Sequence, residues 1–156
     1  MRSRMYRNTK TWNPFVGCLH DCVYCKPSFK AQLKRQKKRC LDCYNYKPHI
    51  HRERLERIPS IKIVFVVGNG DISFCPIEFT KEIIEAIKKH NKRCSYKTYY
   101  FQSKNPRYFQ HFLKDLPSNA ILLTTLETNR DEGYRKISKA PLPTKRFQDF
   151  LALRHE

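Results

Sequence analysis

Three cysteines, Cys18, Cys22 and Cys25, lie close together near the N-terminus in a C-x3-C-x2-C spacing. A [4Fe–4S] cube normally takes four cysteine thiolates, one for each iron, so three ligands leave one iron free to bind a group that is not protein. The spacing therefore predicts an open iron–sulfur site. The alternative is a zinc site that His20 or a distant residue completes, although structural zinc usually takes paired C-x2-C units.

A second group of metal-ligating residues follows further along the chain. Cys40 and Cys43 form a C-x2-C unit, and His49 and His51 come soon after. Thiolate and imidazole are the ligands of tetrahedral structural zinc, so Cys40 and Cys43 predict a second metal site, with zinc as the expected ion. The H-x-H spacing is shorter than in zinc fingers, and we expect its two rings to point to opposite sides of an extended segment. The alternative is that both cysteines pack as small apolar side chains beside neighbouring tyrosines.

The first cysteine loop, with Tyr24 directly before its third cysteine, resembles the signature of the radical S-adenosylmethionine (SAM) superfamily. Other segments, spread over most of the chain, resemble an uncharacterised phage-type branch of it: Thr11-Trp12-Asn13-Pro14, Gly17-Cys18, His49 to Leu55, Gly68 to Asp71 and Lys104 to Arg107. The resemblance implies a [4Fe–4S] cluster that cleaves SAM reductively, and a 5′-deoxyadenosyl radical that abstracts hydrogen from a substrate. It also implies an electron donor such as a flavodoxin or ferredoxin. The sequence does not indicate the substrate.

Strand and helix signals alternate along the chain, which favours an α/β fold with a parallel sheet. Expected strands are a short one before the cysteine loop and those at 61–67, 95–102 and 120–126; expected helices begin near 27, 76–80, 105 and 144, the last two after the N-cap candidates Asn105 and Thr144. The apolar residues of the last three helices are expected to face inward: Phe79, Ile83, Ile84 and Ile87; Tyr108, Phe109, Phe112 and Leu113; and Phe147, Phe150 and Leu151. These elements make about four β/α units, whereas the resemblance implies a partial (β/α)6 barrel. We therefore expect residues 1–156 to form a single, incomplete radical SAM barrel. Its open edge is expected to be covered by the C-terminal segment, or completed by a partner subunit or a dimer.

Polar residues follow three of the expected strands, where an open parallel sheet binds its ligands. The resemblance assigns Gly68, Asn69, Gly70 and Asp71 to the amino group of SAM, and Tyr24 to the cofactor site. A tight turn with positive φ at the glycines is the alternative. Polar side chains at the ends of the next two strands suit the ribose hydroxyls or the carboxylate of SAM: Ser103, Lys104, Thr125 and Glu127. Helix capping and surface salt bridges are the competing explanations.

The chain of 156 residues carries a net charge of +18, which favours phosphate-bearing partners. Lys30, Lys34, Lys37 and Lys38 recur at helical spacing, so a nucleic acid is a candidate partner or substrate. A solvated lysine-rich helix would give the same pattern. The rival to an enzyme is a basic, zinc- or cluster-stabilised nucleic-acid-binding module without catalysis. A third alternative is a degenerate barrel subunit that binds SAM poorly and works only in a complex.

The chain begins with basic and polar residues rather than an apolar run, and its longest apolar stretch, at 61–67, is too short to span a bilayer. Seven cysteines are an odd number. We therefore expect a cytoplasmic protein whose reduced thiols bind metals, with no membrane partner. Cys75 and Cys94 are expected in the core, as are the aromatic residues at 96, 99, 100 and 101.

Overall fold

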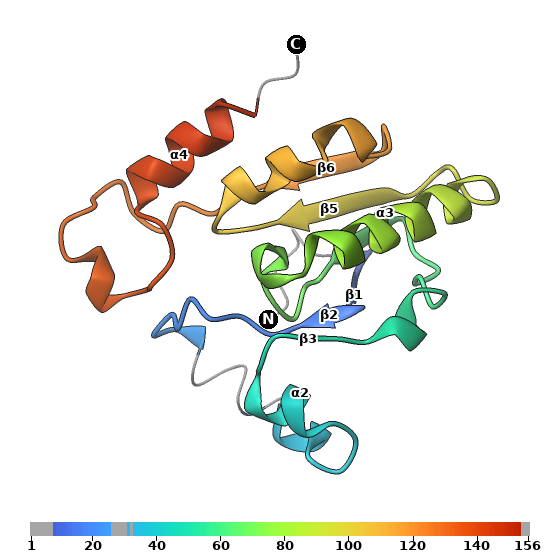
Figure 1. The fold of residues 1–156 in the computed structure, drawn as a ribbon, viewed down its shortest axis with the longest axis horizontal. Coiled ribbons are helices and arrows are strands. Elements are labelled where there is room, and N and C mark those ends of the chain that lie inside the picture. The colour runs from blue at the N-terminus through green and yellow to red at the C-terminus, as the bar shows by residue number, and fades with distance from the viewer. Residues whose placement is uncertain (1–7, 26–30, 32, 154–156) are drawn as a thin grey trace.

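The computed structural model describes residues 8–25, 31 and 33–153. At its centre lies a four-stranded sheet in which every pair of neighbouring strands is parallel (Figure 1). The strands lie in the order β1 (Thr9–Trp12), β4 (Ile63–Val66), β5 (Thr98–Gln102) and β6 (Ala120–Leu123). The predicted α/β class is therefore confirmed. Within the described part of the chain, the sheet has two edges, β1 and β6, and does not close into a barrel.

One face of the sheet packs against α3 (Ile77–Asn91), which lies across it in Figure 1. Alternate strand residues point to this face because side chains of a strand alternate, and Val64, Val66, Tyr99 and Phe101 are buried there. The face of α3 that meets them is the predicted one, with Phe79, Ile83, Ile84 and Ile87 all buried. Full burial of each Val, Ile or Phe side chain among them stabilises the fold by roughly 1.5–3 kcal/mol relative to exposure to water.

The helix expected near residue 105 is a 3-10 helix, Pro106–His111, followed by a second one at Leu113–Asp115. Asn105 precedes Pro106 but its side chain makes no capping hydrogen bond. Of the residues expected to face inward, Tyr108, Phe109 and Phe112 are buried, and Leu113 is half-buried against the core.

In the last helix, α4 (Pro143–Leu151), only Phe150 of the predicted inward face packs against the core. Phe147 is 50% exposed and Leu151 is 43% exposed, whereas Pro143 and Arg146 are buried. Thr144 lies inside the helix, so it is not the N-cap. The apolar pattern failed at Phe147 and Leu151 because α4 also docks through the buried charged side chain of Arg146.

Other expectations on single residues also differ from the structure. Tyr96 is 61% exposed rather than in the core, and Cys94 is only half-buried, whereas Cys75 is buried as expected. The helix expected near residue 27 and Lys30 fall outside the described residues. Beyond that gap, the described basic segment forms a 3-10 helix, Lys34–Gln36, and then a turn.

A small antiparallel sheet connects the two cysteine-containing segments. It pairs β2 (Phe15–Val16) with β3 (His49–Ile50), and α2 (Leu41–Asn45) lies just before β3 (Figure 1). The first cysteine loop leaves β2 directly at Gly17, so both groups of metal-ligating residues start from this sheet. No helix in the described part of the chain is both long and apolar enough to cross a membrane.

Candidate functional site

The carboxyl ends of β4, β5 and β6 and the first cysteine loop surround one cavity of about 320 Å3. Parallel strands end at the same edge of a sheet, which is why residues far apart in sequence meet here. The wall contains all the expected site residues of this region except Asn69: Cys18, Cys22, Tyr24, Cys25, Gly68, Gly70, Asp71, Ser103, Lys104, Thr125 and Glu127. Tyr46, Phe65, Val66, Val67 and Gln102 complete the wall. The volume falls at the lower end of the range of about 300–1,000 Å3 that is usual for small-molecule sites.

The turn after β4 is strained at Val67 rather than at its glycines. Val67 has a φ of 58°, a conformation that is rare for a β-branched residue, while neither Gly68 nor Gly70 has a positive φ. A Cβ on Gly68 would lie 2.4 Å from Cγ2 of Thr11, and one on Gly70 would lie 2.6 Å from the carbonyl oxygen of Gly17. The glycines are therefore required by close approach, and the predicted positive φ at these positions is wrong.

Asn69 does not contribute to the cavity wall. Its backbone N–H donates to Oδ1 of Asn13 at 2.7 Å, and its carbonyl accepts from the N–H of Gly17 at 3.2 Å. Asn69 thus fastens the turn after β4 to the segment that leads into the cysteine loop.

Asp71 is a buried junction between the cysteine loop and the ends of β4 and β5. Its carboxylate accepts hydrogen bonds from the hydroxyl of Ser103 at 2.6 Å and from the backbone N–H groups of Ser73 and Lys104 at 3.0 and 2.8 Å. Nε2 of His20 lies 3.2 Å from Oδ2. Burial alone would raise the pKa of Asp71, but His20 and the hydrogen bonds from Ser103 and Lys104 outweigh it and lower the pKa. Asp71 is therefore ionised and positions other parts of the wall.

Lys104 and Glu127 form an ion pair across the cavity wall. The hydroxyl of Tyr24 donates to Oε1 of Glu127 at 2.5 Å, and the hydroxyl of Tyr134 donates to Oε2 at 3.0 Å. Arg146 of α4 donates to the same Oε2 at 2.7 Å. Burial lowers the pKa of Lys104, although nearby Cys22 and Asp71 oppose this. Glu127 therefore holds three elements together: the cysteine loop, the end of β5 and α4.

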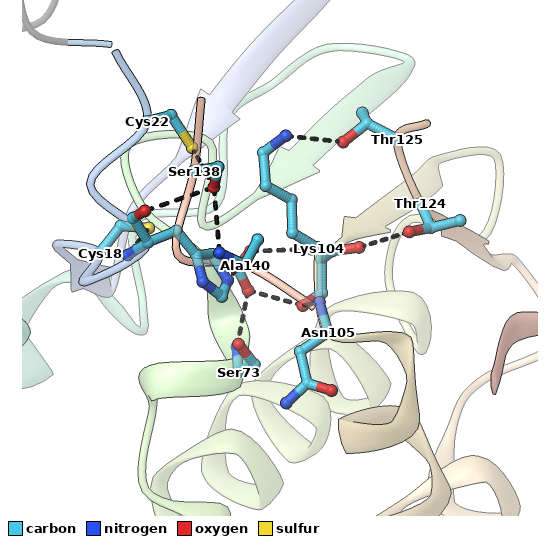
Figure 2. A network of polar contacts seen from close by, with 12 residues as sticks. Cys18, Cys22, Ser73, Lys104, Asn105, Thr124, Thr125, Ser138 and Ala140 are labelled. Atoms are coloured by element: carbon cyan, nitrogen blue, oxygen red, sulfur yellow. Dashed lines mark hydrogen bonds and ion pairs between the residues drawn. The ribbon is translucent and has the colours of Figure 1, made fainter. Parts of the chain in front are cut away.

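The loop at 137–140 contacts the first cysteine loop, and Figure 2 shows the contact between Cys22 and Ser138. Sγ of Cys22 lies 3.1 Å from the hydroxyl oxygen of Ser138, and that hydroxyl donates to the carbonyl of His20 at 3.3 Å. The N–H of Val23 donates to the carbonyl of Ile137 at 2.9 Å. Figure 2 also shows Lys104 reaching Thr125, at 3.2 Å from Nζ to Oγ1.

The thiols of this loop are held in a partly dry environment. Burial raises the pKa of Cys18 to about 12, despite a hydrogen bond from the N–H of His20, and burial also raises the pKa of Cys25. Metals bind thiolate rather than thiol, so a bound cation would have to compensate these buried charges.

The second candidate metal site is more compact. One ligating atom from each of Cys40, Cys43, His49 and His51 lies within 4.8 Å of all the others. Both histidine rings point to the same side because residues two apart in an extended strand share a face. The expectation that they point to opposite sides is therefore wrong, and the histidines join the two predicted cysteines.

Several residues of these sites carry no signal in the sequence. Arg146 and Tyr134 are more than 100 residues from the first cysteine loop in the sequence, and their segments contain no motif. Ser138 is an ordinary loop serine as far as the sequence shows. Tyr46 enters the cavity wall because it is the left-handed C-cap of α2, with a φ of 55°. Such roles depend on tertiary contacts that local patterns do not encode.

Comparison with models of protein families, with curated proteins and with solved structures finds no match for this chain. Any inference about function therefore rests on the α/β fold, the cavity at the strand ends and the Cys2His2 group.

Proposed function

We propose that the chain is a radical SAM enzyme whose [4Fe–4S] cluster is held by Cys18, Cys22 and Cys25. The supporting observation is the single cavity that gathers these cysteines with the polar residues following three neighbouring strands. When bound, the cluster supplies the electron that cleaves SAM reductively to a 5′-deoxyadenosyl radical. A one-electron protein donor of the flavodoxin or ferredoxin type is the proposed source of that electron.

The donor set of the cavity supports this proposal. Among the described residues, three thiols and no fourth cysteine line the wall, so a bound [4Fe–4S] cluster would keep one iron for a ligand that is not protein. Backbone groups of Gly68 and Gly70 face the same space and are the proposed partners of the SAM amino group.

Lys104 is the proposed partner of the SAM carboxylate. Its ammonium group already lines the cavity and pairs with Glu127. When Lys104 turns to the cofactor, Glu127 keeps Arg146 as its cationic partner, so no unpaired carboxylate remains in the wall. Glu127, Thr125 and Ser103 already make hydrogen bonds within the protein, so a ribose hydroxyl would either share these groups with their present partners or replace one of those partners.

Reconstitution of the full chain under anaerobic conditions tests the proposal. We expect about four irons per chain and formation of 5′-deoxyadenosine after addition of SAM and dithionite. Cys22→Ala should lose the iron, while the matched variant Cys94→Ala should retain both iron and activity. No 5′-deoxyadenosine above the level of Cys22→Ala would contradict the proposed activity.

Lys104→Met separates cofactor binding from cluster binding. Iron content should stay at the wild-type level, while the Kd for SAM should rise about tenfold or more, as expected when a charged hydrogen bond of about 1.5–3 kcal/mol is lost. Unchanged SAM affinity would remove Lys104 from the cofactor site.

The net charge of +18 favours a nucleic acid as the substrate or partner. The same charge supports a second candidate, a metal-stabilised nucleic-acid-binding module without catalysis. Nucleic-acid binding by a reconstituted protein that forms no 5′-deoxyadenosine would favour that second candidate.

A further inference from the structure

Four potential metal ligands converge where α2 meets β3: Cys40, Cys43, His49 and His51. They are separate in sequence from the proposed iron–sulfur cysteines. Nε2 of His51 lies 3.1 Å from Sγ of Cys43, and Nε2 of His49 lies 3.3 Å from the same sulfur. Nε2 of His49 lies 3.4 Å from Sγ of Cys40 and 2.8 Å from Nε2 of His51. Zinc binds nitrogen at about 2.0–2.1 Å and sulfur at about 2.3 Å, so the corners of its tetrahedron lie roughly 3.3–3.8 Å apart. These four separations, 2.8–3.4 Å, lie at or somewhat below these values, and all six lie within 4.8 Å.

The far sides of both imidazole rings already have partners. Nδ1 of His49 lies 2.7 Å from the carbonyl oxygen of Lys47, and a carbonyl can only accept a hydrogen bond. Nδ1 of His51 lies 2.9 Å from Oε1 of Glu53. Each Nδ1 therefore donates a hydrogen bond to its partner, and in this tautomer the lone pair of each Nε2 points toward the other donors. A carbonyl or carboxylate behind a histidine is the usual support of a metal-ligating imidazole.

Two lone pairs that face each other at 2.8 Å repel unless a cation or a proton lies between them. The sulfur atoms of Cys40 and Cys43 both lie beside Nε2 of His49. Sγ of Cys40 also accepts a hydrogen bond from the N–H of Cys43 at 3.4 Å. One cation among the four atoms satisfies all of them. A mixed set of two sulfurs and two nitrogens selects zinc over calcium and magnesium, which prefer oxygen ligands.

We propose that Cys40, Cys43, His49 and His51 bind one Zn²⁺ ion in a closed, tetrahedral structural site. All four positions are filled by protein, so the ion has no open position for water or substrate. Its role is to fix α2 and β3 as one unit. This unit touches the first cysteine loop because a Cβ on Gly17 would lie 2.4 Å from the backbone of Lys47.

The test is the zinc content of the full chain together with the geometry of the bound ion. We expect one zinc per chain, and X-ray absorption should give about two Zn–S bonds near 2.3 Å and two Zn–N bonds near 2.0 Å. Replacement by Co²⁺ should give the intense visible bands of tetrahedral cobalt. A zinc-free wild-type protein, or oxygen-rich coordination, would overturn the proposal.

Two pairs of matched variants locate the site. Cys43→Ser should lose the zinc and Cys94→Ser should keep it. Because Cys43→Ser can also unfold the chain, Glu53→Gln provides a milder test that retains all four ligands. It should weaken zinc affinity by about tenfold or more, measured by competition with a coloured chelator, while Glu56→Gln should leave affinity unchanged. Equal affinity in these two variants would overturn the assignment of His51.

The zinc site and the proposed iron–sulfur site are distinguishable in the same measurements. Cys22→Ala should keep the zinc while losing iron, so zinc binding stands even where SAM cleavage fails. Loss of zinc in Cys22→Ala with retention in Cys43→Ser would place the zinc at the first loop and overturn the proposal.

Discussion

Arg146 has no solvent-exposed surface, yet its guanidinium group carries a positive charge. Nη1 donates to the carbonyl of Thr125 at 2.5 Å, and Nη2 donates to Glu127 and to the hydroxyl of Tyr134, each at 2.7 Å. A buried charge is tolerated only when other groups compensate it. Arg146 thus ties α4 to the cavity wall through Glu127, and the wall depends on a helix that contributes no lining residue of its own.

We expect Arg146→Met to lower the free energy of unfolding by about 3 kcal/mol, because removing one partner of a buried ion pair leaves the other uncompensated. Glu127 still has Lys104 nearby, which keeps the loss at the lower end of the usual range. Urea unfolding measures it. Lys145→Met on the exposed side of α4 is the control and should change stability by less than about 1 kcal/mol. An equal loss of unfolding free energy in both variants would show that the buried ion pair of Arg146 does not stabilise the fold.

The sequence predicted which residues line the cavity better than it predicted what they do. Asp71 and Glu127 were placed at the cavity because parallel strands end at one edge, and this requires only the strand pattern. Their hydrogen bonds to Ser103, Tyr24 and Arg146 depend on the packing of distant segments, so no local pattern shows that these carboxylates already have partners.

Among the elements, α3 and α4 show when an apolar pattern determines a buried face. In α3, Ile83, Ile84 and Ile87 recur at helical spacing and all are buried, so burial of apolar surface decided its orientation. In α4, the same reasoning selected Phe147, which is half-exposed, because the ion pair of Arg146 with Glu127 fixes the helix instead. The pattern could not reveal this, since Glu127 belongs to the segment after β6.

The junction of β2 with the first cysteine loop depends on Gly17, which has a φ of 109°. We expect Gly17→Ala to destabilise the fold by roughly 2–5 kcal/mol, because a left-handed conformation costs about 1–2 kcal/mol and crowding adds about 1–3 kcal/mol. Gly133→Ala is the matched control. Gly133 also has a positive φ, of 71°, but a Cβ there would meet no atom within 4 Å.

Thermal or urea unfolding of these two variants separates strain from crowding. Gly133→Ala should lose only about 1–2 kcal/mol. If Gly17→Ala loses no more than Gly133→Ala, the close approach of Lys47 to Gly17 is not a constraint on the fold.

Across the whole molecule, the net charge of +18 is the property most relevant to partners. Lys34, Lys37 and Lys38 are all exposed and lie on the segment that leads into α2. Their positive potential attracts polyanions without reading a sequence, because phosphate contacts are the same for every base. Under the proposal that a nucleic acid is the substrate, this basic segment would bind its phosphates and the cavity would hold the reacting nucleotide.

We expect the affinity of the full chain for single-stranded RNA or DNA to fall log-linearly with salt concentration. Reversal of Lys34, Lys37 and Lys38 to Glu should weaken binding to all sequences alike. The slope of log affinity against log salt concentration should fall in magnitude by about 2–3, slightly less than one for each lost phosphate contact. Fluorescence anisotropy over a salt series gives both quantities.

The control reverses Lys81 and Lys89 on α3 and Lys92 at its C-cap to Glu, which lowers the net charge by the same amount. It should weaken binding less than the first triple variant does. Equal weakening would mean that total charge rather than this segment attracts the nucleic acid, and no binding at low ionic strength would exclude it as a substrate.

The pairing of β1 with β4 has a consequence for how the chain folds. Thr9 pairs with Ile63, whereas Tyr99 pairs with Ala120, so the first strand must close by far the longer loop. Closure entropy grows with loop length, and contacts of high sequence separation form late. We therefore expect β4, β5 and β6 to assemble first, although β1 is synthesised before them. Both cysteine groups lie within the loop that β1 must close, so metal binding would order part of that loop and the metal-free chain should add its first strand more slowly.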